Sequence, residues 1–158
     1  MIKSQIVRKT NKKVLNKLFQ KIKNIHDQHV SIGYFKSQGL HSQANMPYAN
    51  LLYVHAHGLV YGAPVRDVMA HLRPMISGGN SESIMILKLL RGYFNNKMTR
   101  EEVFSEIGRS YRDKGKSIFG NPSYLVATDS NPTPLVDTKE LRDNFAYKTS
   151  ITMRVVTR

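Results

Sequence analysis

Cysteine is absent from this chain of 158 residues, which excludes disulfide bonds and thiolate chemistry. Stability must therefore come from packing, and the composition fits assembly in a reducing compartment. No stretch approaches the roughly 20 consecutive apolar residues that cross a bilayer, so we expect no membrane partner. The N-terminus is basic, but no apolar run of the signal-peptide type follows it, and we expect a soluble protein that is not secreted.

Acidic residues are missing from the first part of the chain. The first acid is Asp27, and the basic residues before it are Lys3, Arg8, Lys9, Lys12, Lys13, Lys17, Lys21 and Lys23. The whole chain carries a formal net charge of +13, and a field of this sign attracts polyanions without regard to their sequence. Charge alone does not distinguish nucleic acid from an acidic lipid or an acidic protein surface.

Motifs for catalysis and ligand binding are also missing. The six histidines have no cysteine partners and no His-Glu-x-x-His spacing, so they fit surface or polar-network positions better than a metal site. No serine lies in a Gly-x-Ser-x-Gly turn, and Gly78-Gly79-Asn80-Ser81 lacks the Gly-Lys pair of a phosphate-binding loop. We therefore predict no catalytic residue, no metal and no cofactor, and we do not expect an enzyme.

The first 27 residues have the pattern of a basic amphipathic helix, running from Lys9 to about His26. Its apolar residues recur every three or four positions, at Val14, Leu15, Leu18, Ile22 and Ile25. This stripe can pack on the body of the protein, while the lysine face can point to solvent, to a neighbouring subunit or to an anion. The lysines fall mostly elsewhere on the helix, and the candidate contacts to a polyanion or a partner are Lys12, Lys13, Lys17 and Lys21. The alternative is that these lysines form a solvated face.

Periodicity predicts the other elements. Apolar residues alternate in segments 29–35 and 145–155, which indicates two strands. Helices are predicted after a cap at Asn45, in a short turn ending before Pro74, around residues 86–94, and after a capping box at Thr99–Glu102. Loops are predicted at 36–45 and 77–81, and a long surface loop at 115–133. The expected fold is a single α+β domain, residues 1–158, with a small, mainly antiparallel sheet covered by about four helices.

The most informative segment runs from Pro134 to Tyr147. It contains a proline-ended loop, a short helix and the start of the last strand. Asp137 lies three residues before Glu140, and at this spacing two side chains can satisfy backbone N–H groups reciprocally at a helix start. The pair can therefore act much as a capping box does.

This segment and several others resemble the small head-tail joining and tail-completion proteins of long-tailed bacteriophages. The matching positions near the C-terminus are Pro134, Leu135, Val136, Asp137, Thr138, Leu141, Arg142 and Tyr147. Upstream, the matches are Val54-His55-Ala56-His57-Gly58, Pro64-Val65-Arg66 and Leu72-Arg73-Pro74. Lys139 stands where the family usually has glycine, and Asp67-Val68 stands where it usually has proline-phenylalanine.

The resemblance implies a structural protein at the neck or tail of a phage virion, assembled in the host cytoplasm. It implies a homo-oligomeric ring, commonly a hexamer, around the channel through which the genome leaves. The implied partners are further copies of the chain, adjacent neck and tail proteins, and genomic DNA by non-specific contact. The long loops of the expected fold would be covered by neighbouring copies in such a ring.

The motif positions that would determine the fold or form the interface are Arg66, Asp137, Thr138, Leu141 and Arg142. We hypothesise that Arg66 lies near Asp137 and helps to fix the C-terminal loop. The alternative is that each of these two residues only serves its own segment.

Other classes of function stay open at this point. A small basic nucleic-acid-binding or packaging accessory protein of a phage would explain the charge without a ring. A minor tail protein is the nearest variant of the structural hypothesis. A hydrolase has no sequence feature in its favour.

Overall fold

The computed structural model describes residues 12–59, 64–77, 79–130, 133–135 and 139–151. Within these ranges the elements are α1 (Lys12–His26), β1 (Gln28–Gly33), a 3-10 turn (Lys36–Gln38), α2 (Tyr48–Ala56), α3 (Val68–Ile76), α4 (Asn80–Phe94), α5 (Arg100–Ile118), α6 (Glu140–Asn144) and β2 (Ala146–Ile151). The two strands form one antiparallel sheet. The predicted α+β class, with a small antiparallel sheet and several helices, is confirmed.

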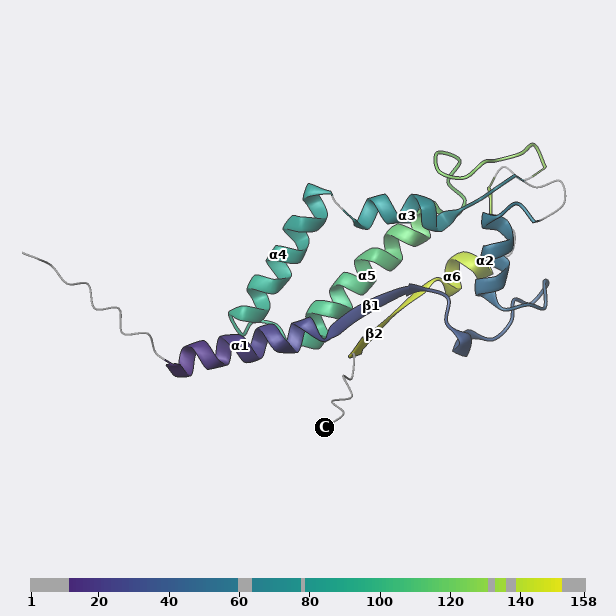
Figure 1. The fold of residues 1–158 in the computed structure, drawn as a ribbon. Helices are drawn as coiled ribbons and strands as arrows, with labels where there is room; N and C mark the ends of the chain where they lie inside the picture. The colour runs from purple at the N-terminus through teal and green to yellow at the C-terminus, as the bar shows by residue number, and fades with distance from the viewer. Residues whose placement is uncertain (1–11, 60–63, 78, 131–132, 136–138, 152–158) are drawn as a thin grey trace, which may run out of the picture.

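The described part of the molecule is elongated, with α1 at one end and α2, α6 and several loops at the other (Figure 1). The sheet and α5 run side by side through the middle. β1 pairs with β2 from Gln28 opposite Ile151 to Gly33 opposite Ala146. Because α1 leads directly into β1, the helix projects beyond the end of the sheet.

The alternation predicted for the first strand is visible in β1, where His29 and Ser31 are exposed. Val30 packs beside Tyr93, Val103 and Phe104, one of two clusters of buried apolar residues. Ile32 packs against the other and larger cluster, towards the opposite end of the strand. The predicted strand at 145–155 is confirmed up to Ile151, and the remainder of that prediction lies outside the described residues.

The capping box predicted at the start of α5 is confirmed. The main-chain N–H of Thr99 donates to Glu102 Oε2 over 2.7 Å, and the Thr99 hydroxyl accepts from the N–H of Glu102 over 3.2 Å. The reciprocal pair satisfies two N–H groups that have no partner within the helix. It begins the helix that packs along both strands of the sheet.

The prediction of a loop beginning at Gly115 was wrong, because α5 continues to Ile118. Gly115 is a packing position: a methyl group there would overlap the ring of Phe145, which is 1% exposed. Gly108, two turns earlier, meets the ring of Tyr147 in the same way. Glycine therefore lets the helix approach the sheet at two points, and this packing outweighs the low helix propensity of glycine.

The chain after α5 was predicted to cross the surface, but part of it enters the core. Phe119, Leu125, Pro134 and Leu135 are buried, three of them within the larger cluster, and the N–H of Gly120 donates to the Pro134 carbonyl over 2.8 Å. The segment therefore folds back on itself. Apolar side chains at these few positions hold it against the core, while many of its polar residues face solvent.

Two helix boundaries differ from the prediction. α2 is capped by Pro47 and not by Asn45, which has φ of 47° and donates its N–H to the His41 carbonyl in a tight turn. α3 continues through Pro74 to Ile76, although proline removes one helical hydrogen bond. Met75 and Ile76 pack against the larger cluster beyond the proline, and this burial compensates for the missing bond.

The predicted loop at 77–81 is shorter than expected, because α4 begins at Asn80. Glu82, in the first turn of α4, is 7% exposed and forms an ion pair with Lys114 of α5. Lys114 also donates to the Met75 carbonyl over 3.3 Å at the end of α3. The Lys114 ammonium group thus connects α3, α4 and α5, and it holds the start of α4 against α5.

Candidate interaction surface

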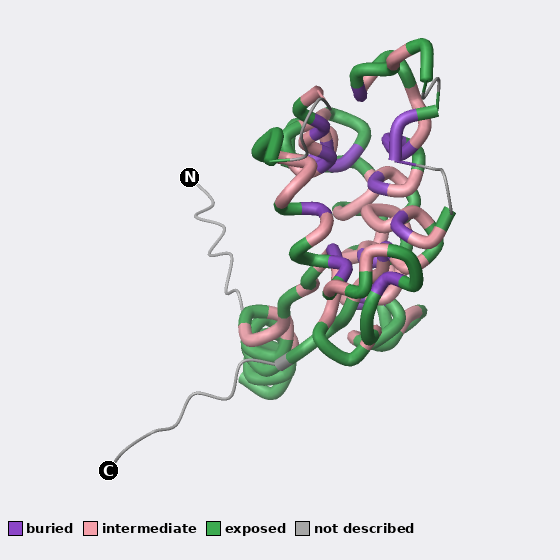
Figure 2. Tube along the Cα trace, turned by 90° about the vertical axis from the view of Figure 1, so that its right-hand side faces the viewer, coloured by how far each residue is buried: buried purple, intermediate pink, exposed green. Residues whose placement is uncertain are grey.

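The apolar side of α1 is exposed to solvent. Figure 2 shows α1 as a coil of exposed and intermediate residues, none of them buried. The exposed fractions along the stripe are Val14 61%, Leu15 37%, Leu18 43%, Phe19 64% and Ile22 48%. We call these five residues the α1 face. The stripe packs on the body of the protein only at its end, where Ile25 contacts the smaller cluster.

Lys21 attaches α1 to the C-terminal end of α4. Its Nζ donates to the carbonyls of Tyr93 and Phe94, each over 3.0 Å, and to Asn96 Oδ1 over 2.7 Å. The ammonium also lies 5.2 Å from the centre of the Tyr93 ring. Since the last carbonyls of a helix lack partners within it and carry partial negative charge, a cation there is stabilising.

The predicted role of Lys21 therefore changes. Its three N–H groups all point at acceptors within the chain, so it serves as a structural contact while these bonds last. Lys12, Lys13 and Lys17 are exposed and lie on the part of α1 that projects from the body. Their exposure keeps them candidates for contact with a polyanion or a partner.

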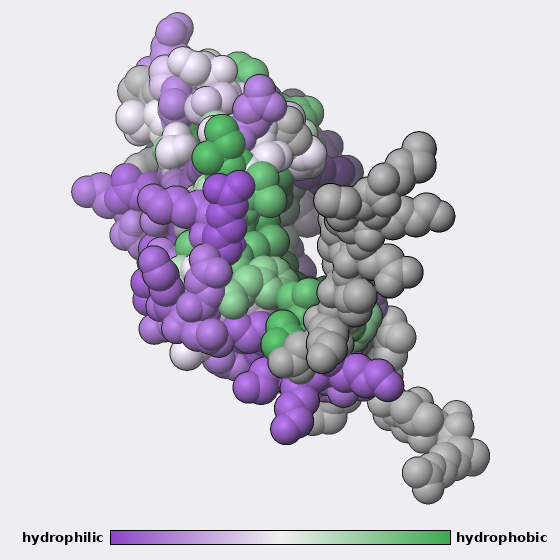
Figure 3. Space-filling view, turned by 90° about the vertical axis from the view of Figure 1, so that its left-hand side faces the viewer, coloured by the Kyte–Doolittle hydropathy of each residue, from purple (hydrophilic) through white to green (hydrophobic). Residues whose placement is uncertain are grey.

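Helix α4 also carries exposed apolar side chains. Ile84 and Leu87 of α4 are 66% and 53% exposed. Figure 3 looks onto the side of the molecule where α1 and α4 project, and an apolar band runs up the middle of that side, with hydrophilic side chains to its left. An exposed apolar surface of this kind, with polar side chains along its edge, is typical of a protein–protein contact.

A second apolar surface lies at the other end of the molecule, around the C-terminal end of α2. It consists of Tyr53, Leu59, Val65 and Val126, which are between 55% and 64% exposed. We call it the α2-end patch. Two short contacts place Leu59 and Val65 at the end of α2: a methyl group at Gly58 would lie 3.0 Å from Val65 Cγ2, and the N–H of Leu59 donates to the Val54 carbonyl over 3.0 Å.

Arg66 is a buried residue that hydrogen-bonds to the main chain beside the α2-end patch. The residue is 4% exposed, its N–H donates to the His55 carbonyl over 2.9 Å, and its Nε donates to the Val126 carbonyl over 3.0 Å. It therefore joins the end of α2 to the segment that follows α5. Asp137 and Thr138 lie outside the described residues, so the predicted proximity of Arg66 and Asp137 stays a prediction.

Leu141 and Arg142, the other motif positions, belong to α6. Leu141 is 5% exposed in the larger cluster, and its carbonyl accepts a hydrogen bond of 2.5 Å from the Tyr34 hydroxyl. Arg142 pairs with its neighbour Asp143, Nε to Oδ1, over 3.2 Å at the surface. Leu141 is thus a determinant of the fold, whereas Arg142 is available at the edge of α6.

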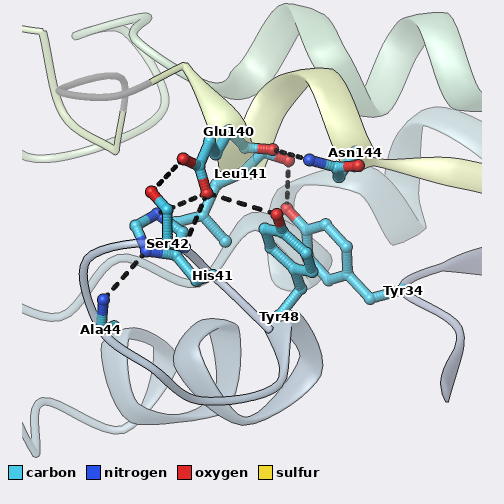
Figure 4. A network of polar contacts seen from close by, with 8 residues as sticks. All are labelled: Tyr34, His41, Ser42, Ala44, Tyr48, Glu140, Leu141 and Asn144. Atoms are coloured by element: carbon cyan, nitrogen blue, oxygen red, sulfur yellow. Dashed lines mark hydrogen bonds and ion pairs between the residues drawn. The ribbon is translucent and has the colours of Figure 1, made fainter. Parts of the chain in front are cut away.

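The start of α6 differs from the prediction for Glu140, and Asp137, the other member of the predicted capping pair, lies outside the described residues. α6 begins at Glu140 and is preceded by Lys139, which adopts a left-handed conformation with φ of 60°. The Glu140 carboxylate points away from its own helix and accepts from the N–H of Ser42 over 3.0 Å, from the Ser42 hydroxyl, and from the Tyr48 hydroxyl over 3.2 Å (Figure 4). These bonds hold the loop before α2 against α6.

The electrostatics of this network favour the charged carboxylate. The hydrogen bonds from the Ser42 hydroxyl and N–H lower the pKa of Glu140, while burial and then the nearby carboxylate raise the pKa of Tyr48. His41, 6% exposed, places Nε2 at 3.7 Å from Glu140 Oε2, and its Nδ1 accepts from the N–H of Ala44 over 3.2 Å. The network anchors the start of α2, whose other end carries the α2-end patch.

Sites for small molecules are poorly developed in the part of the chain that the structure describes. No group of three potential metal-binding side chains occurs there. A surface pocket of about 310 Å³ lies between α1 and the α4–α5 turn, and its lining includes Lys21 and Glu102. Both side chains already hydrogen-bond to main-chain groups. Among the described helices, none combines the length and apolar character that crossing a membrane requires.

Comparison of the chain with models of protein families, with curated proteins and with solved structures finds no match. The function proposed below therefore rests on the surfaces of the chain itself and on the resemblance of its motifs.

Proposed function

We propose that this protein is a structural subunit of a tailed bacteriophage virion, a tail-completion or head-tail joining protein that works as a homo-oligomeric ring around the DNA channel. The observation that carries the proposal is the exposed α1 face, with five large apolar residues on one side of a helix. The proposal also draws on the resemblance of the motifs around Arg66 and Leu141 to that family.

The physical support comes from the energetics of the exposed stripe. Fully burying one leucine, isoleucine, valine or phenylalanine side chain gains roughly 1.5–3 kcal/mol, and a continuous exposed patch of such residues is rare on a monomer. The α1 stripe is therefore better explained as a surface that another protein covers. A ring of identical subunits supplies a covering surface on every copy.

The positive charge is compatible with this function. Lys12, Lys13 and Lys17 are exposed beside the α1 face, and α1 contains no acidic residue. In a ring around a genome, cations of this kind would make non-specific contact with phosphates. Adjacent neck and tail proteins would be further partners, in the virion and, during assembly, in the host cytoplasm.

The mass of the purified assembly tests the proposal. We expect native mass spectrometry and light scattering to give a closed oligomer, with six copies as the expected number, and electron microscopy to show rings. A monomer at every concentration would contradict the proposal.

The charge of α1 favours one second candidate, a small basic nucleic-acid-binding or packaging accessory protein. The two candidates differ in what happens without DNA. The structural subunit forms rings in the absence of nucleic acid, whereas the accessory protein binds duplex DNA tightly as a monomer or dimer, with an affinity that falls steeply with salt.

A further inference from the structure

The exposed large apolar residues gather at two ends of the described molecule. The α1 face lies at one end and the α2-end patch lies at the other, and α4, whose C-terminal end meets α1, carries the exposed Ile84 and Leu87 (Figure 1). Leu40, 52% exposed, also belongs to the second end, because it pairs with Pro47 just before α2. Two different apolar surfaces at opposite ends favour contacts that run head to tail.

The charges of the two surfaces differ in a way that decides which contacts are favourable. α1 carries Lys12, Lys13, Lys17 and Lys23 and no acid. A two-fold contact of α1 with its own copy would bring these ammonium groups together, and repulsion between like charges would oppose it. The sequence from Ser37 to Val65 contains no lysine, arginine, aspartate or glutamate. Arg66, the cation beside the α2-end patch, follows this segment and is 4% exposed, so a helix bordered by lysines meets no exposed cation from residues 37–65.

The rigidity of the second surface also suits docking. Arg66 joins the end of α2 to the Val126 carbonyl, and the Glu140 network fixes the start of α2. α1 is attached to the body through Lys21 and Ile25. The α2-end patch is thus held in place before it meets a partner, which lowers the entropy cost of association, and α1 is fixed to the body at its C-terminal end.

We propose that the α1 face of one copy docks on the α2-end patch of the next copy, so that copies join head to tail. This inference rests on the proposed function only in requiring that the protein associates with itself. One patch meeting a different patch is a heterologous contact, which forms a ring when the rotation between copies closes. The lysines of α1 flank this contact and remain at its rim.

Disulfide cross-linking tests the contact directly, because the chain has no cysteine of its own. We choose Leu18→Cys on the α1 face and Val65→Cys on the α2-end patch, positions that are 43% and 56% exposed. Mixing the two single variants should give a cross-linked dimer containing one of each, detected by mass spectrometry. Cross-linking of Leu18→Cys with itself as the main product would overturn the proposal, since it would show two-fold pairing of α1.

Gln20→Cys is the matched control for this experiment. Gln20 is exposed on the same helix, and a residue two positions from Leu18 points roughly 160° away from it. We expect Gln20→Cys to give little cross-linking with Val65→Cys. Equal yields from Leu18→Cys and Gln20→Cys would mean that collisions, and not a docked helix, produce the bond, and would overturn the inference.

A charge substitution separates this inference from the proposed function. Leu18→Glu should weaken self-association by roughly 30-fold or more, the level of an interface hot spot. Gln20→Glu carries the same charge on the opposite side of α1 and should assemble like the wild type. If both variants form rings, the docking proposal fails and the proposed function stands; if the wild type itself is a monomer, both fail.

Discussion

The ammonium of Lys21 lies 3.0 Å from the main-chain carbonyl oxygen of Tyr93, a residue 72 positions further along the chain. The same ammonium also binds the Phe94 carbonyl and Asn96. A side chain of α1 therefore caps the C-terminal end of α4, and this contact attaches α1 to the body of the protein. The part of α1 before Lys21, which carries most of the α1 face, projects beyond this attachment.

Lys21→Met tests this attachment, because methionine keeps much of the apolar stem and removes the ammonium. We expect the free energy of unfolding to fall by about 1 kcal/mol, the usual scale for a cation at a helix C-terminus. Urea unfolding at a fixed protein concentration measures it. Lys17→Met is the control and should stay within about 0.5 kcal/mol of wild type. Equal destabilisation of both variants would contradict a specific role of Lys21.

Gly115→Ala tests the approach of α5 to the sheet. Alanine is favoured over glycine in a helix by about 1 kcal/mol, but its methyl group would overlap the buried ring of Phe145. We expect a net decrease in stability of about 2 kcal/mol, since overpacking a core costs more than the propensity gains. Thermal or urea unfolding checks the value.

Gly92→Ala is the matched control within α4. Its methyl group would lie 2.9 Å from Met98 Sδ, and a methionine side chain can move aside. The variant should lie within about 1 kcal/mol of wild type. A Gly115→Ala protein as stable as Gly92→Ala would show that the ring of Phe145 is not held tightly against α5.

The Glu140 network predicts a dependence of stability on pH. Hydrogen bonds from Ser42 lower the pKa of Glu140 below the ordinary glutamate value of 4.5. A group whose pKa is lowered by folding stabilises the folded state above its unfolded pKa, and the contribution disappears as pH falls through the folded pKa. The stability difference between wild type and Glu140→Gln should therefore be largest near neutral pH and shrink below pH 4.5.

Urea unfolding of both proteins across this pH range gives the measurement. Glu106→Gln is a suitable control, because Glu106 is paired with Arg109 of its own helix at the surface. Its effect should be small at every pH, as for most exposed ion pairs. A wild-type advantage over Glu140→Gln that stays constant down to acid pH would contradict the network.

The exposed lysines of α1 predict salt-sensitive binding to DNA. Replacing Lys12, Lys13 and Lys17 with glutamine should lower the slope of log affinity against log salt by up to roughly 2.7 for duplex DNA, about 0.9 for each phosphate that is no longer neutralised. Fluorescence anisotropy over a salt series measures the slope. An affinity that does not depend on salt would rule out the electrostatic account.

A second triple variant controls for net charge. Lys36, Lys88 and Lys97 lie in three other segments, and replacing them removes the same total charge. This variant should keep most of the wild-type slope. An equal reduction by both triple variants would mean that total charge, and not the position of α1, governs the contact with DNA.

Local patterns were sufficient to predict much of the fold. The helix of residues 12–26, both strands and the capping box at Thr99 depend on neighbours a few positions away, and periodicity or spacing reports such neighbours directly. The α+β class followed from these elements. Of the motif positions, Leu141 is a packing position of the fold, since it is buried in the larger cluster.

Contacts between distant segments decided the rest. Gly115 has the sequence pattern of a helix breaker, but it is a packing position, because the ring of Phe145, 30 residues further along the chain, lies against it. Glu140 has the spacing of a capping residue, but its carboxylate accepts a hydrogen bond from Ser42. Lys21 has the sequence pattern of a surface cation, but its ammonium binds a main-chain carbonyl at the C-terminal end of α4. The exposure of the α1 face belongs here too: periodicity shows that a helix has an apolar side, but only packing determines whether the same chain covers it or leaves it for another.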